Sequence, residues 1–173
     1  MYIDLTQLED EELRVEHRYD ERFDLQDPDL RLKMAPKVQL VARWAAGRDV
    51  RVRGRLKAAV EVPCDRCLSY FLVPIDVEFD LFYAPIETLT PEEDVPLTPK
   101  DLAYGFYRDE KIDVDGLVRE QIFLALPFRW LCAPSCRGLC PQCGIDLNKG
   151  TCSCAEERVA PYWSALRDLK RSM

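Results

Sequence analysis

The sequence predicts an α+β protein in which an antiparallel β-sheet meander is combined with one buried helix. Two observations favour this fold: apolar and polar residues alternate through residues 37–83, and residues 112–127 carry a broad apolar surface. A third observation separates the C-terminal end, because six of the eight cysteines lie within residues 132–154. We therefore expect a core domain over residues 1–131 and a cysteine-rich segment over residues 132–173.

Five stretches predict strands. Residues 3–5 and 13–17 alternate briefly and predict two short strands. Three longer runs, at 38–44, 50–62 and 71–81, predict a meander of half-buried antiparallel strands. A tight turn through Asp65-Arg66 would set apolar residues opposite apolar ones, with Val52, Gly54 and Leu56 facing Phe79, Val77 and Ile75. The same register would set Arg51, Arg53 and Arg55 opposite Asp80, Glu78 and Asp76.

The remaining segments predict a loop and two helices. Residues 84–111 contain four prolines among many acids, which predicts a long acidic loop that Tyr104, Phe106 and Tyr107 fix to the core. After a strand fragment, a helix capped by Asp113 or Asp115 should end at Pro127. Its expected apolar residues are Leu117, Val118, Ile122, Leu124, Ala125 and Leu126. Residues 156–173 predict a short amphipathic helix that uses Trp163, Leu166 and Leu169.

The eight cysteines form four close pairs: Cys64 and Cys67, Cys132 and Cys136, Cys140 and Cys143, Cys152 and Cys154. Zinc prefers four thiolate or imidazole ligands in a tetrahedron, so four pairs fit two structural sites. The last two pairs form a zinc-ribbon-like unit, and the first two pairs would join the hairpin tip to the chain after the helix. Two alternatives stay open: Cys136 and Cys140 could exchange roles, or only one site could hold metal.

Composition excludes several classes of protein. The net charge is −7 and the pI is about 4.9, which disfavours nucleic-acid binding at long range. No apolar run of membrane-spanning length and no secretory signal is present, so we expect a cytoplasmic protein with reduced thiols. The single histidine, His17, and the absence of nucleotide or triad motifs predict no enzymatic activity and no small-molecule substrate.

Several motifs resemble the YceD/DUF177 family, known as the large ribosomal RNA subunit accumulation proteins. The resemblance covers nearly the whole chain and rests on an ordered set of segments: Ile3-Asp4-Leu5, Val62-Pro63-Cys64-Asp65-Arg66-Cys67-Leu68, the helix from Leu117 through Glu120-Gln121-Ile122 to Leu124-Ala125-Leu126-Pro127, and Cys136-Arg137-Gly138-Leu139-Cys140-Pro141-Gln142-Cys143-Gly144-Ile145-Asp146-Leu147-Asn148. It implies a role in making or stabilising large-subunit ribosomal RNA and no known enzymatic activity.

Two details of the family bear on this chain. Some members keep only the hairpin pair and one later pair of cysteines, which supports sorting the eight cysteines into two sites. Members often carry Asp-Pro-Arg before the last helix. This chain has Ala160-Pro161-Tyr162-Trp163 there, so no role of that arginine is carried over.

The expected partner is ribosomal RNA or a pre-ribosomal particle. The candidate RNA-binding residues surround the cysteine-rich segment: Arg129, Arg137, Lys149, Arg158, Arg167, Lys170 and Arg171. The basic stripe from Arg51 to Lys57 is instead expected to form cross-strand ion pairs. An alternative is an adaptor that binds a basic ribosomal protein through the acidic loop. A thiol oxidoreductase at Cys64 and Cys67 is disfavoured, because reactive pairs usually sit at a helix N-terminus.

Overall fold

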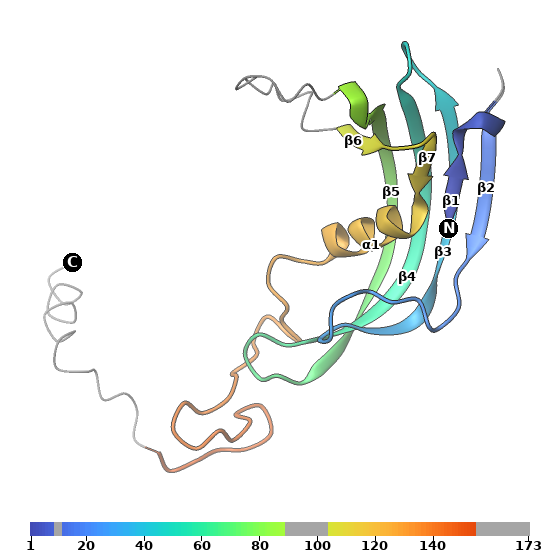
Figure 1. Ribbon diagram of the computed structural model, residues 1–173. Helices are drawn as coiled ribbons and strands as arrows, with labels where there is room; N and C mark the ends of the chain where they lie inside the picture. The colour runs from blue at the N-terminus through green and yellow to red at the C-terminus, as the bar shows by residue number, and fades with distance from the viewer. Residues whose placement is uncertain (9–11, 89–103, 155–173) are drawn as a thin grey trace, which may run out of the picture.

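A computed structural model describes residues 1–8, 12–88 and 104–154 of the chain (Figure 1). Its centre is a five-stranded sheet in the order β2-β3-β4-β5-β6. The strands are β2 (Leu13–Arg18), β3 (Arg31–Trp44), β4 (Val50–Pro63), β5 (Tyr70–Pro85) and β6 (Tyr104–Tyr107). The other elements are β1 (Tyr2–Asp4), β7 (Lys111–Asp113), the helix α1 (Val114–Ala125) and two 3-10 turns, η1 (Leu5–Gln7) and η2 (Ile86–Thr88). The predicted α+β fold is confirmed.

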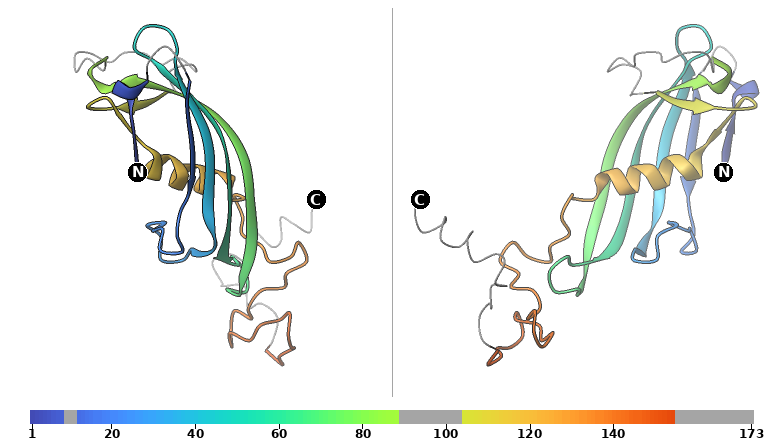
Figure 2. Two further views of the ribbon diagram at one scale, coloured as in Figure 1. Left: turned by 90° about the vertical axis from the view of Figure 1, so that its right-hand side faces the viewer. Right: turned by 60° about the vertical axis from the view of Figure 1, so that its left-hand side comes forward.

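The core lies on one face of the sheet. The small β1–β7 sheet and α1 cover that face, as the two views of Figure 2 show. Alternate residues of β4 point into it, and Val52 and Leu56 are fully buried in the same cluster as Val118 and Ile122 of α1. Burial of such side chains stabilises the fold by about 1.5–3 kcal/mol each. The sheet therefore has an apolar inner face and a polar outer face.

The predicted acidic loop over residues 84–111 is wrong at both ends. β5 continues to Pro85, and β6 adds a strand to its edge in parallel, with Phe82 opposite Tyr104. Tyr107 is buried and its hydroxyl donates to the Arg48 carbonyl at 2.9 Å, so the chain is fixed to the core there. Residues 89–103 lie outside the described residues.

The predicted register between β4 and β5 is wrong by two residues. The turn runs from Cys64 to Ser69, because the Cys64 amide donates to the Ser69 carbonyl at 3.0 Å and Leu68 takes a left-handed φ of 59°. Val52 consequently faces Leu81, and Gly54 faces Phe79. Because side chains alternate with period two, the slip leaves every residue on its predicted face.

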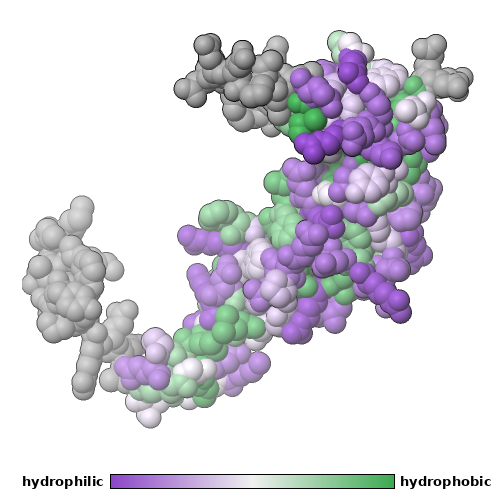
Figure 3. Space-filling view, in the orientation of Figure 1, coloured by the Kyte–Doolittle hydropathy of each residue, from purple (hydrophilic) through white to green (hydrophobic). Residues whose placement is uncertain are grey.

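The helix begins and ends close to the prediction. Asp113 is the N-cap and accepts the amide of Asp115 at 3.0 Å, and Leu126 is the C-cap, immediately before Pro127. The prediction that Leu124 is buried is wrong, because it is 70% exposed. The helical period turns it away from the sheet. With Phe123 and Phe128 it contributes hydrophobic surface near the start of the cysteine-rich segment (Figure 3). No helix in the described part of the chain is long and apolar enough to cross a membrane.

Gly54 provides a test of the observed register. A Cβ at this position would lie 2.5 Å from both the Gln39 carbonyl oxygen and the Phe79 ring. We expect Gly54→Ala to lower the free energy of unfolding by about 1–3 kcal/mol, since overpacking forces neighbours apart. Urea denaturation measures the change. Gly150→Ala, where the nearest atom would be 3.5 Å away, should be close to neutral. Equal stability of the two variants would contradict the register.

Candidate metal centre

The first cysteine cluster joins two distant parts of the chain. Cys64 and Cys67 lie in the turn between β4 and β5, while Cys132 and Cys136 come from the segment that follows α1. All four Sγ atoms lie within 4.8 Å of one another, with Cys64 to Cys136 at 3.8 Å and Cys67 to Cys132 at 3.7 Å. A tetrahedron with metal–sulfur bonds of about 2.3 Å has edges of about 3.8 Å. The sulfur positions therefore fit a four-thiolate metal site.

These separations also distinguish a metal site from disulfides. A disulfide holds its sulfurs about 2.05 Å apart, far closer than the sulfurs lie here. All eight cysteines are free in the structure. The second cluster contains Cys140, Cys143, Cys152 and Cys154, again within 4.8 Å. The structure thus brings together the two groups of four that the spacing favours, with Cys136 in the first group and Cys140 in the second.

The two clusters are built on the same backbone turn. Leu68 donates its amide to the Cys64 carbonyl at 2.9 Å, and Gly144 donates to Cys140 at the same distance. In both turns the amide of the first cysteine donates to the carbonyl five residues later, from Cys64 to Ser69 and from Cys140 to Ile145. Both turns need a left-handed residue, with φ of 59° at Leu68 and 73° at Gly144. Each turn holds two thiols side by side in the geometry of a zinc knuckle.

Backbone amides stabilise one thiolate in each cluster. Burial alone would raise the pKa of Cys64, but amides of Cys132, Cys67 and Arg66 outweigh it and lower that pKa to about 6. The Cys132 amide lies 3.4 Å from the Cys64 sulfur. In the second cluster, amides of Cys143 and Gln142 lower the pKa of Cys140 to about 6. Both turns therefore favour the form of sulfur that binds metal.

The other thiols of each cluster respond to their neighbours. Hydrogen bonds with the sulfurs of Cys136 and Cys67 raise the pKa of Cys132 to about 12, since a second thiolate beside the first is unfavourable. In the second cluster, the hydrogen bond with Cys143 raises the pKa of Cys154 to about 12. A divalent cation among the sulfurs would reverse this effect, because it stabilises all four thiolates.

Polar contacts outside the sulfurs connect the clusters. Asn148 donates its side-chain amide to the Cys136 sulfur at 3.3 Å and accepts the Arg137 amide at 2.8 Å. Arg66 donates a guanidinium hydrogen to the Cys136 carbonyl at 2.8 Å, and its own carbonyl accepts the Leu139 amide at 3.1 Å. The first turn is therefore bound directly to the start of the second.

A second set of contacts fixes the hairpin tip to the chain after α1. Asp65 accepts the Trp130 amide through its carboxylate at 2.7 Å, and its own amide donates to the Trp130 carbonyl at 2.7 Å. Apart from their position in or next to the turns, nothing in the sequence indicates the roles of Asp65, Arg66 and Asn148.

The structure describes three of the seven candidate RNA-binding residues. Arg129 and Arg137 are exposed, and neither forms an ion pair with another described residue. Lys149 is exposed, and its Nζ lies 3.4 Å from a carboxylate oxygen of Asp146. The other four candidates, Arg158, Arg167, Lys170 and Arg171, lie outside the described residues, as does the predicted helix over 156–173.

Comparison with known proteins shows that one family model matches most of this chain. The model of the family described as "Large ribosomal RNA subunit accumulation protein YceD" matches residues 52–170, a range that includes all eight cysteines. No solved structure matches the chain.

Individual proteins of bacteria and plants are also similar to this chain. An uncharacterized protein of Mycobacterium tuberculosis is 32% identical over 120 residues, which are 69% of this chain and 55% of that protein. An uncharacterized protein of Mycobacterium leprae is 28% identical over 127 residues, 72% of this chain and 55% of the relative. The chloroplastic YCED homolog 1 of Arabidopsis thaliana, named a large ribosomal RNA subunit accumulation protein, is 30% identical over 64 residues, 37% of this chain and 20% of the relative. The chain spans about half the length of the mycobacterial relatives.

Loss of one thiolate from the first cluster should affect the whole fold. We expect Cys64→Ser to lower the free energy of unfolding by more than about 4 kcal/mol, because metal binding and folding are coupled at such a site. Thermal and urea denaturation measure the effect, and Ser135→Ala, an exposed change between two cysteines, is the control. A Cys64→Ser protein as stable as the control would contradict a metal-linked junction.

Asn148 should act on one site only. We expect Asn148→Ala to weaken metal binding by the first cluster roughly 10- to 100-fold, as loss of a hydrogen bond to a ligand does elsewhere. Competition with a chromophoric chelator measures both sites separately. Lys149→Ala, next to it in sequence, should leave both affinities unchanged. Equal weakening of both sites would show that Asn148 supports general folding instead.

Proposed function

Because the chain belongs to the YceD family, we propose that it supports the accumulation of large-subunit ribosomal RNA as a zinc-stabilised protein without enzymatic activity. The observation that carries this proposal is the family match over residues 52–170, which contains both cysteine clusters. The names of the plant relatives state the same role for those proteins. A protein of this kind would act by binding ribosomal RNA or a pre-ribosomal particle.

Zinc is the metal that this donor set favours. Each cluster offers four thiols, and no carboxylate among the described residues joins either group, which is typical of structural zinc sites. A bound zinc ion supplies charge and a fixed tetrahedral link. The chain's own residues prepare the ligands: backbone amides favour the ionised sulfurs of Cys64 and Cys140, and Asn148 orients Cys136.

The clusters support a structural role over a redox role. A thiol oxidoreductase needs an accessible sulfur to attack a disulfide, but Cys64 is completely buried and Cys67 nearly so. Each lies within 4 Å of a sulfur from the segment after α1. We infer that these thiols serve as ligands in a reducing compartment, with the cytoplasm as the expected location.

Exposed cations near the clusters support contact with RNA. Arg129, just before the cysteine-rich segment, and Arg137 within it are exposed and form no ion pair among the described residues. Zinc knuckles present backbone and basic side chains to RNA in other proteins. The rival function is an adaptor that holds a basic ribosomal protein through the acidic residues around 84–101. The test below distinguishes it from direct binding of RNA.

The test is made in cells that lack the protein. We expect the ratio of large- to small-subunit ribosomal RNA to fall, and to be restored by the wild-type chain but not by Cys140→Ser. Crosslinking of the wild-type chain should recover large-subunit ribosomal RNA. Recovery of a basic ribosomal protein without RNA would favour the adaptor, while an unchanged ratio would contradict the proposed function.

A further inference from the structure

Among the described residues, the outer face of the sheet carries a charge of opposite sign to that of the protein as a whole. No described element covers this face, which lies opposite α1 in Figure 2. In the region around Arg51, the three strands β2, β3 and β4 contribute eight cations: Arg14, Arg18, Lys37, Arg43, Arg51, Arg53, Arg55 and Lys57. The acids among them are Glu12, Glu16, Asp76, Glu78 and Asp80. Among the described residues of this region, eight cations against five acids leave a surplus of three positive charges, on a chain with net charge −7.

The observed register explains why the acids do not balance the cations. Arg51 and Arg53 share Asp80, at 2.6 and 3.0 Å, and Arg55 and Lys57 share Asp76, at 2.6 and 3.4 Å. The cross-strand ion pairs predicted for this stripe are confirmed, including Arg51 with Asp80 and Arg55 with Asp76. The predicted pair of Arg53 with Glu78 is wrong, because Arg53 shares Asp80 with Arg51.

Two of the arginines face each other directly. Arg43 lies opposite Arg51, and Arg43 forms no ion pair within the part of the chain described. Like charges opposite one another destabilise a sheet. An anion bound between them would remove that repulsion.

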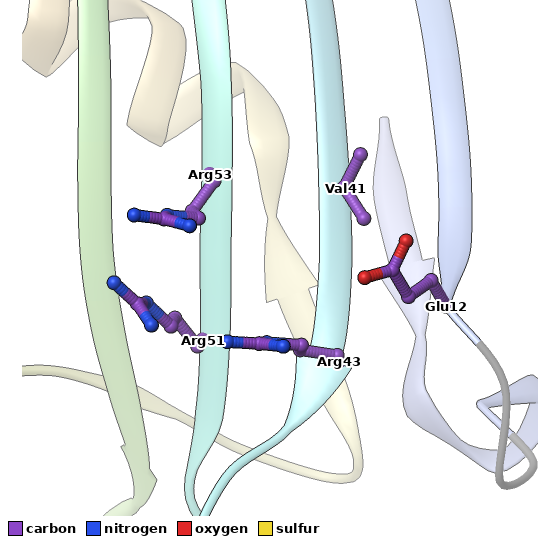
Figure 4. A pocket seen from close by; sticks show the side chains of 5 residues that line it. All are labelled: Glu12, Val41, Arg43, Arg51 and Arg53. Atoms are coloured by element: carbon purple, nitrogen blue, oxygen red, sulfur yellow. The ribbon is translucent and has the colours of Figure 1, made fainter.

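These arginines surround a hollow on the sheet. Glu12, Val41, Arg43, Arg51 and Arg53 line it, and Figure 4 shows the three guanidinium groups projecting on one face of β3 and β4. Guanidinium groups bind phosphate through paired hydrogen bonds. Hydrogen bonds from Arg51 and Arg53 also hold the pKa of Asp80 at about 2, so Asp80 stays ionised and orients both groups.

Aromatic rings extend the same row of residues. Arg51 lies opposite Phe82, and Phe82 lies opposite Tyr104 on the edge strand β6. The two rings are 5.6 Å apart, and the Arg51 guanidinium is 5.4 Å from the Phe82 ring. Phe82 and Tyr104 are both partly exposed. Basic side chains beside exposed rings are typical of surfaces that bind single-stranded RNA, where phosphates meet cations and bases stack on rings.

We propose that this outer face, centred on Arg43, Arg51, Arg53 and Phe82, binds single-stranded RNA. The guanidinium groups contact successive phosphates, and Phe82 with Tyr104 offers a platform for an unstacked base. The inference rests on the proposed function and adds a second RNA contact, separate from the cysteine-rich segment.

The experiment compares two matched pairs of substitutions. Fluorescence anisotropy with a labelled single-stranded RNA of mixed sequence, about 16 nucleotides long, gives affinity as a function of salt. Arg43→Gln with Arg53→Gln should weaken binding at least about tenfold and reduce the salt slope by about 0.7 for each lost phosphate contact. Arg129→Gln with Arg137→Gln removes the same amount of charge from the start of the cysteine-rich segment and the residues just before it. Phe82→Leu should weaken binding roughly tenfold with an unchanged slope, since stacking releases no counterions.

Circular dichroism and thermal melting confirm that each variant is folded. Weakened binding in the Arg43 and Arg53 variant, with polyglutamate unable to compete, supports the inference. Weakening only in the Arg129 and Arg137 variant overturns it and leaves the proposed function intact. Competition by polyglutamate equal to that by RNA overturns it in favour of an acidic protein partner. If the wild type binds no RNA at low salt, direct contact is excluded, and the ribosomal RNA ratio in cells then tests the proposed function by itself.

Discussion

Convergence of four cysteine sulfurs from two distant segments is the constraint on which the arrangement of the molecule depends. Cys64 and Cys67 sit at the tip of the longest hairpin, and Cys132 and Cys136 follow α1. The strands and helix have an apolar core of their own. The described part of the cysteine-rich segment, residues 132–154, has only a small buried cluster, which consists of Cys136 with Cys64 and Cys67 of the hairpin turn and a few partly buried apolar neighbours. Metal coordination can supply the free energy that such a segment cannot obtain from apolar burial.

Once the hairpin tip is fixed, the two faces of the sheet take different roles. The inner face packs into the core, where Val52 and Leu56 of the sheet and Val118 and Ile122 of α1 are fully buried. The outer face carries surplus positive charge and stays uncovered within the described residues. An acidic protein can in this way repel nucleic acid over most of its surface and still orient a local basic face toward it.

Alternation of apolar and polar residues was enough to predict the meander and both short N-terminal strands. The helix was predicted from its broad apolar surface, its aspartate cap and Pro127. The register was missed because the turn is two residues longer than its cysteines suggest. The signal was present in the second turn: Gly144 after Cys143 marks the left-handed position that Leu68 occupies after Cys67. Because leucine rarely adopts that conformation, Leu68 does not indicate a left-handed position in the first turn. The edge strand β6 was missed because parallel pairing with β5 joins residues separated by many prolines and acids. The sorting of cysteines was easier, since metal chemistry limits the combinations.

The most direct test of the account is the metal content and ligand set of the purified protein. Native mass spectrometry should find two zinc ions per chain, and X-ray absorption at the zinc edge should find four sulfur ligands at about 2.3 Å. That result would place a tetrahedral thiolate site at both the hairpin tip and the second turn. A protein that is folded and free of metal, or one whose zinc is bound by oxygen or nitrogen, would contradict it.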